Sequence, residues 1–84
     1  IYVGKGTNYF PKIQVGEFLV ESGSLAKGDT ILVLGPELGM AKETMERLVV
    51  NGVEADQASK GDKITFPIAS KISAKDKLYK LVKA

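Results

Sequence analysis

The chain has 84 residues and contains neither cysteine nor histidine. Without these residue types it has no thiolate nucleophile, no imidazole base, no cysteine ligands for an iron–sulfur cluster and no ordinary zinc site. Tryptophan is absent, and aromatic residues make up only 7% of the chain. The longest apolar run, at 31–34, has four residues, whereas a membrane span needs ~18–20. We therefore expect no catalytic residue, no cofactor, no metal and no membrane contact.

The composition predicts one small globular domain over residues 1–84. Hydrophobic residues make up 44% and charged residues 26%, which is ordinary for a folded domain. A domain of this size buries only ~60–65% of the surface of its unfolded chain, so its core is thin. The chain begins at Ile1 and shows no charged-then-apolar leader. We expect a fragment of a longer, cytoplasmic protein.

Charge is unevenly spread, although the net charge is only +2. Residues 60–84 carry seven lysines against two aspartates, and residues 17–59 carry eight acidic residues against three basic ones. The basic end is either a stripe that binds phosphate or an acidic partner, or a solvated lysine face. Because the chain has a single arginine, we do not expect base-specific recognition of nucleic acid.

A small residue followed by Lys-Gly-Asp occurs at 26–29 and again at 59–62, with a looser copy at 74–76. Glycine adopts positive φ at little cost, and aspartate can bond its own nearby backbone. The pattern predicts turns that lead into strands. Asp29 and Asp62 are thus expected to anchor turns rather than to form a catalytic carboxylate pair.

Turn residues divide the chain into six short strands, predicted at 1–5, 12–21, 30–34, 42–50, 63–68 and 77–83. The apolar positions change parity at Gly16-Glu17, which predicts a β-bulge there. Residues 38–49 also fit a helical pattern, but Asn51-Gly52 is typical of a type I′ hairpin. That hairpin favours a strand, with a helical turn near 37–40 as the alternative. Together these elements predict an all-β fold, a small six-stranded closed β-barrel.

Candidate binding residues cluster near the two ends of the sequence. Tyr9 and Phe10 are adjacent in a predicted turn and cannot both face the core, so at least one is expected on the surface. The candidates are Lys5, Tyr9, Phe10, Lys12, Lys77, Tyr79 and Lys80. A cationic, aromatic patch suits RNA or an acidic partner. The alternative is that Tyr9 and Phe10 plug the barrel end or pack on another domain.

Two further motifs are not expected to bind phosphate or to act in catalysis. Gly4-Lys5-Gly6-Thr7 lacks the spacing of a phosphate-binding loop and is expected to be a turn that ends a strand. Ser22 and Ser24 have no base partner, which argues against nucleophilic catalysis.

Several segments together resemble a known family. Val15 to Phe18, Gly23 to Ile31, Gly35-Pro36 and Ala58 to Asp62 resemble the six-stranded barrel of translation factors, as in domain 2 of elongation factor Tu. The opening and closing segments, YVGKGTNYF and DKLYKL, narrow the match. With them, nearly the whole chain resembles the C-terminal domain of peptidase family U32, the collagenase-like peptidases.

This resemblance implies an accessory domain without a catalytic site of its own. Its partners would be an N-terminal catalytic domain of the same protein and a macromolecular substrate, protein or RNA, that the barrel positions. Two alternatives stay open: a structural module for docking or dimerisation, and domain 2 of a translation GTPase. The resemblance leaves the substrate and the oligomeric state open.

Overall fold

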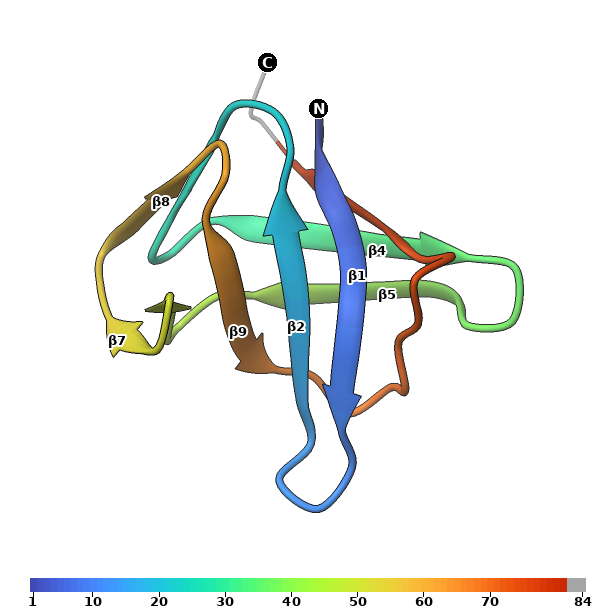
Figure 1. The fold of residues 1–84 in the computed structure, drawn as a ribbon. Coiled ribbons are helices and arrows are strands. Elements are labelled where there is room, and N and C mark those ends of the chain that lie inside the picture. Colours follow the sequence, from blue (N-terminus) through green and yellow to red (C-terminus); the bar gives the residue numbers. More distant parts are fainter. Residues whose placement is uncertain (82–84) are drawn as a thin grey trace.

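The computed structural model describes residues 1–81 and shows ten β-strands (Figure 1). The strands are β1 (Tyr2–Phe10), β2 (Val15–Val20), β3 (Ser24–Ala26), β4 (Thr30–Gly35), β5 (Gly39–Thr44), β6 (Val49–Val50), β7 (Val53–Glu54), β8 (Gln57–Ser59), β9 (Lys63–Pro67) and β10 (Lys77–Lys80). No helix forms in residues 1–81, and so no helix there has the length and hydrophobicity to cross a membrane. The predicted all-β class is confirmed.

Eight strands form one antiparallel sheet in the order β5-β4-β10-β1-β2-β9-β6-β7, and β3 pairs with β8 separately. The last strand, β10, lies between β1 and β4. Figure 1 shows the sheet curling so that β4 and β5 cross β1, β2 and β9. Within the described residues β5 and β7 end the sheet and do not pair with each other. The closed six-stranded barrel is therefore not confirmed, because the strands are more numerous and a seam stays open.

The middle of the chain departs from the predicted strand over 42–50. β5 begins at Gly39 and ends at Thr44, and β6 starts only at Val49. Between them the Met45 backbone bonds the preceding turn, because its N–H donates to Asp29 and its C=O accepts from Gly28. The prediction of a continuous strand over 42–50 is therefore wrong. The alternative, a helical turn near 37–40, is also wrong, because a turn there leads directly into β5.

The three Lys/Asp turns have the same construction, as predicted for the first two. In each, the aspartate carboxylate accepts a hydrogen bond from the backbone N–H three residues earlier, at 2.9 Å for Asp29, 2.9 Å for Asp62 and 2.7 Å for Asp76. Gly28 and Gly61 have φ of 96° and 94°, the left-handed region that glycine tolerates. These carboxylates hold turns and do not form a pair.

The type I′ hairpin is confirmed as well. Asn51 and Gly52 both have positive φ, 50° and 86°, and they join β6 to β7. In addition, the Asn51 side chain accepts a hydrogen bond from the Lys63 N–H at 3.0 Å and donates to Asp62 at 3.2 Å. The hairpin is thereby tied to the start of β9.

The predicted bulge at Gly16-Glu17 was misplaced. β2 alternates regularly, with Gly16 and Phe18 both turned into the core. A Cβ on Gly16 would lie 2.9 Å from Ile68, so a larger residue at this inward position would require neighbouring core side chains to shift. The apparent change of parity arises because Val15 points outward and its inward neighbour has no side chain. The register shifts lie in β1 instead, between residues 6 and 8 in its pairing with β2 and between residues 2 and 4 in its pairing with β10.

The core is built from inward side chains of the curled sheet together with Leu25 of β3 and Ala58 of β8, and the rings of Phe18 and Phe66 stack in it at 5.0 Å. β1 continues to Phe10, so Tyr9 and Phe10 lie in a strand rather than in the predicted turn. β10 ends at Lys80, and the part of the predicted strand 77–83 at residues 82 and 83 lies outside the described residues.

Candidate functional site

The outer face of the large sheet gathers residues from six strands into aligned rows. Successive residues of a strand point to opposite faces, so the register brings outward residues together. One row consists of Met40, Leu34, Lys77, Lys5, Leu19 and Lys63. A second row consists of Lys42, Leu32, Tyr79 and Tyr2. We call these ten residues the lysine–tyrosine face.

Two tyrosines form the centre of this face. The rings of Tyr2 and Tyr79 meet edge to face at 5.7 Å, a favourable aromatic geometry. The Lys77 ammonium lies 5.8 Å from the centre of the Tyr2 ring, within the range of a cation–π contact. The Tyr2 hydroxyl donates to the Glu21 carboxylate. This hydrogen bond, together with burial and the negative charge, raises the pKa of Tyr2 from 10.0 to about 12.

Glu21 and Glu17 are both engaged in hydrogen bonds to other side chains. Glu21 accepts from Tyr2, and Glu17 accepts from the Thr7 hydroxyl at 2.7 Å. Within residues 1–81 the ion pair is Arg47–Glu54, so none of the face's four lysines has a carboxylate within 4.0 Å there. The face therefore presents a positive potential beside half-buried aromatic rings and the exposed side chains of Leu34 and Met40.

Three of the predicted binding residues belong to this face. Lys5 lies directly opposite Lys77 across β1 and β10, and Tyr79 is two residues further along β10. Lys80 has the opposite parity. Its ammonium donates to the Ser24 carbonyl at 2.9 Å, which ties β10 to β3.

The remaining three lie elsewhere. Tyr9 faces inward, packs against the core and donates to the carbonyls of Ile68 and Ala69 at 3.2 and 3.3 Å. That is the packing role considered as the alternative. Phe10 points outward and is 37% exposed, and Lys12 is exposed in the following turn. Because a strand rises ~3.3 Å per residue, Phe10 lies roughly 17 Å along β1 from Lys5. It does not extend the lysine–tyrosine face.

Sequence reasoning missed more of the face than it found. It did not identify Tyr2, Lys42 or Lys63, nor the exposed Leu34 and Met40. Alternation within each strand predicts which residues point outward. It does not reveal that β10 lies between β1 and β4, and this insertion aligns the rows.

The acidic side chains of residues 1–81 do not gather into a metal-binding cluster. No group of three or more acidic side chains there is placed to hold an ion. Asp29 and Asp62 hold separate turns. The Gly4-Lys5-Gly6-Thr7 segment lies inside β1, so it is neither a phosphate loop nor the expected turn.

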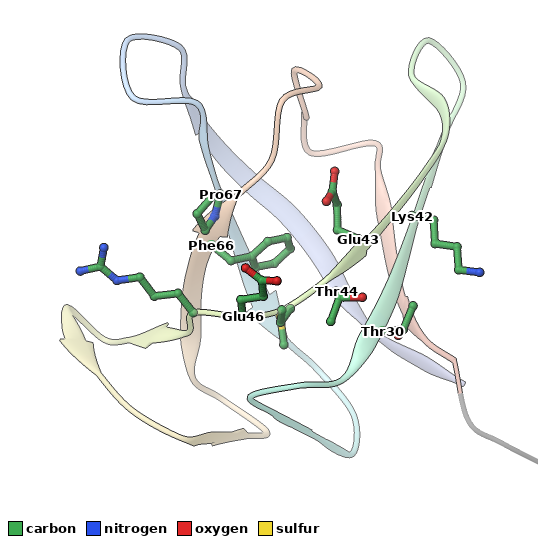
Figure 2. Close-up of a pocket in the computed structure, with 9 residues that line it drawn as sticks. Thr30, Lys42, Glu43, Thr44, Glu46, Phe66 and Pro67 are labelled. Carbon is green, nitrogen blue, oxygen red and sulfur yellow. The ribbon is translucent and has the colours of Figure 1, made fainter.

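A hollow of about 750 Å³ occupies the open seam on the inner side of the sheet. It is lined by Thr30, Lys42, Glu43, Thr44, Met45, Glu46, Arg47, Phe66 and Pro67. In Figure 2 the side chains of Glu43, Glu46 and Phe66 lie toward the hollow, whereas the Lys42 ammonium points away from it. The hollow thus has an apolar base and an acidic side.

Comparison with known proteins identifies relatives over nearly the full chain. No protein-family model matches it. A collagenase of Porphyromonas gingivalis strain W83 is 40% identical over 83 residues, 99% of this chain and 20% of that protein. A second P. gingivalis collagenase is 39% identical over 82 residues, 98% of this chain and 23% of that protein. An uncharacterized protease of Methanocaldococcus jannaschii is 27% identical over 81 residues, 96% of this chain and 20% of that protein. The chain spans about a fifth of the length of these curated relatives.

Two solved structures share the fold. Both are of the C-terminal domain of a Geobacillus thermoleovorans protein described as a U32 peptidase, and both are 18% identical to this chain. One has a TM-score of 0.84 and covers 93% of this chain and 96% of the solved domain. The other has a TM-score of 0.86, with coverage of 96% and 92%. The sequence relatives and the shared fold together show that this chain belongs with the C-terminal domains of the U32, collagenase-like peptidases.

Proposed function

We propose that the chain is the non-catalytic C-terminal domain of a longer U32 peptidase and positions a polypeptide substrate for an N-terminal catalytic domain. The relatives support this, because they are named collagenases and a protease and are about five times longer. Their names also favour this family over a translation GTPase. The predicted cytoplasmic location stays a prediction, which fractionation of cells that make the full protein would test.

The observation that carries the proposal is the lysine–tyrosine face. Its four lysines have no carboxylate partner in residues 1–81, and one of them, Lys77, lies over the ring of Tyr2, which meets Tyr79 edge to face. Unpaired ammonium groups attract acidic side chains, and tyrosine rings contribute contact area at a low entropy cost. The face therefore suits an unfolded polypeptide that carries acidic and apolar residues.

The test compares a double variant, Lys5→Gln with Lys77→Gln, against a control of equal charge, Lys27→Gln with Lys60→Gln. The control lysines are exposed in turns outside the face. Binding of each chain to heat-denatured collagen is measured at several salt concentrations. We expect the face variant to bind about tenfold more weakly, as for two surface charge contacts of ~0.7 kcal/mol each. The control stays near wild type, and binding weakens as salt rises.

The same variants in the full peptidase show whether the face positions substrate. We expect the face variant to raise KM for denatured collagen and to leave cleavage of a short chromogenic peptide unchanged. Equal binding by the face and control variants would overturn the proposal. Tighter binding to single-stranded RNA than to denatured collagen would show that the substrate class is wrong.

A second candidate, docking to the catalytic domain or to another copy, is favoured by two apolar side chains on the same face. Leu34 is 37% exposed and Met40 is 66% exposed. Light scattering on the full protein with Leu34→Ser and Met40→Ser tests this. Changed association or changed stability supports docking, and unchanged values rule it out.

A further inference from the structure

Where the sheet stays open, β5 faces Phe66 and Pro67 of β9 across the hollow, and this seam leaves a long sheet edge unpaired. β5 has six residues and pairs only with β4 in the described part of the chain. At the other end of the sheet, β7 has only two residues. Proteins commonly protect sheet edges by keeping the edge strand short, and β7 follows this rule. β5 does not, and it borders the hollow.

The backbone groups that β5 turns toward the seam follow from the register. The Thr30 carbonyl accepts a hydrogen bond from the Leu81 N–H, so the polar groups of Thr30 point toward β10. Polar groups alternate in direction along a strand, so the odd-numbered residues of β4 and β5 bond each other. Met40, Lys42 and Thr44 therefore direct their N–H groups into the seam. The carbonyls of Met40 and Lys42 point the same way, whereas the Thr44 carbonyl already accepts a hydrogen bond from the Glu46 N–H.

The opposite wall offers packing rather than pairing. The Phe66 ring belongs to the core stack and forms part of the lining. Pro67 has no N–H, so β9 cannot complete a second ladder there. An occupant of the seam would thus bond β5 on one side and pack on β9 on the other.

The charged side chains that line the seam indicate which kind of polypeptide would bind there. Glu43 and Glu46 line the hollow, and neither has an ion-pair partner in residues 1–81. The two cationic residues of the lining do not neutralise them. Arg47 is held by Glu54 at 3.5 Å, and Lys42 points away from the hollow. The seam is therefore complementary to lysine or arginine side chains on an extended chain.

We propose that an extended polypeptide segment with alternating basic and apolar residues binds in this seam as an added strand on β5. Strand addition of this kind takes affinity from backbone bonds and specificity from alternate side chains. The site shares the backbone of Met40 and Lys42 with the lysine–tyrosine face, but the face turns its lysine side chains to the outer side of the sheet and attracts acidic groups, whereas the seam is lined by Glu43 and Glu46. The added strand narrows the opening that separates this sheet from a closed barrel.

The probe is an eight-residue peptide of alternating lysine and valine, blocked at both ends and bound to the 84-residue chain. One comparison peptide has glutamate in place of lysine. The other keeps the lysines but carries N-methyl groups on alternate residues, which remove the N–H donors of one edge. We expect the N-methylated peptide to bind about tenfold more weakly and the glutamate peptide not to bind measurably. Bound lysine peptide should also slow hydrogen exchange at the amides of Met40, Lys42 and Thr44.

Three variants locate the site. Glu43→Gln with Glu46→Gln removes the acidic side, and Lys42→Pro removes one seam-facing N–H without breaking a bond to β4. Both variants should bind the lysine peptide about tenfold more weakly than wild type does. The matched charge control, Glu37→Gln with Asp56→Asn, lies outside the hollow and should bind like wild type. Circular dichroism checks that each variant keeps its sheet.

Several outcomes overturn the inference. The first is that the N-methylated peptide or the glutamate peptide binds as tightly as the lysine peptide. The second is that hydrogen exchange at the β5 amides is unchanged when the lysine peptide is bound. The third is that the variant Lys5→Gln with Lys77→Gln no longer binds the lysine peptide. Dimers of the free chain that the peptide dissociates would identify a second copy as the occupant and overturn the one proposed. Loss of collagen binding in the face variant, with peptide binding kept, bears only on the proposed function.

Discussion

At the scale of single residues, Tyr2 titrates well above an ordinary tyrosine. Its hydroxyl donates to Glu21, and this bond holds the pKa at about 12. Because the folded pKa is raised, the contribution to stability is complete below pH 10 and is lost as pH rises through 12. An alkaline titration at 295 nm should show one phenol ionising about two pH units late.

Two variants assign that late phenol. Tyr2→Phe should remove it from the titration curve. Glu21→Gln should move it back toward pH 10, since the charge is lost while a carbonyl acceptor is kept. A late component that survives in Tyr2→Phe would refute the assignment. Circular dichroism over the same pH range shows whether the chain is still folded.

A second residue-scale prediction concerns Gly35. A Cβ there would lie 1.5 Å from Oδ1 of Asp76, which is itself buried and holds a turn. Gly35→Ala must therefore displace the Asp76 carboxylate from its turn, and we expect a loss of about 1–3 kcal/mol in urea unfolding. Asp76→Ala removes the obstacle along with the turn bond. The double variant should lose less stability than the sum of the two single variants, and simple additivity would contradict the contact.

At the scale of elements, the turn at 59–62 couples stability to acid. The pKa of Asp62 is lowered by the hydrogen bond from the Ser59 N–H, and then by the bond from Asn51. Because the pKa of Asp62 is lower in the folded state, its contribution to stability is complete above pH 3.8, the ordinary pKa of aspartate, and is lost as the pH falls through the folded pKa. Asp62→Asn keeps an acceptor but cannot titrate. Its melting temperature should fall less between pH 5 and pH 2 than that of wild type.

The control for this prediction is Asp56→Asn, an exposed carboxylate outside the three turns. It should follow the wild-type acid curve. If Asp56→Asn and Asp62→Asn flatten the curve equally, the effect belongs to net charge rather than to the turn.

The same elements show how much of the fold the sequence predicted. Turns and hairpins were predicted well, since their signals are local: the Asp29 and Asp62 turns need only a glycine and an adjacent acid, and Asn51-Gly52 needs two positive φ angles. The strands near these signals, β4 and β9, came out close to their observed bounds. The break between β5 and β6 was missed because Met45 bonds a distant turn.

The candidate site was harder to predict, because it depends on which strands are neighbours. Lys5 and Lys77 are 72 positions apart in the sequence and directly opposite in the sheet. Nothing local marks that pairing. Tyr9 was misplaced for a related reason, since its hydroxyl is held by carbonyls near residue 68. The seam was not foreseen at all, because closure or opening of a sheet is decided by strand count and register together.

At the scale of the whole molecule, stability depends on joining the two ends of the chain. β10 pairs with β1 on one side and with β4 on the other, and its Leu78 is fully buried. Without β10 the β4–β5 hairpin loses its connection to the rest of the large sheet. A domain of this length has only about 4–13 kcal/mol of net stability. It cannot lose that connection and stay folded.

We therefore predict that a chain truncated after Ser73 gives no cooperative unfolding transition. A synthetic peptide covering residues 74–84, added in trans, should restore the transition, because strand pairing and the burial of Leu78 are intermolecular in this case. The peptide with Leu78→Ala should restore it poorly, and Leu78→Ala in the full chain should cost about 2–5 kcal/mol. Circular dichroism and urea titration measure both. A truncated chain that still unfolds cooperatively would show that β10 is not the strand that holds the sheet together.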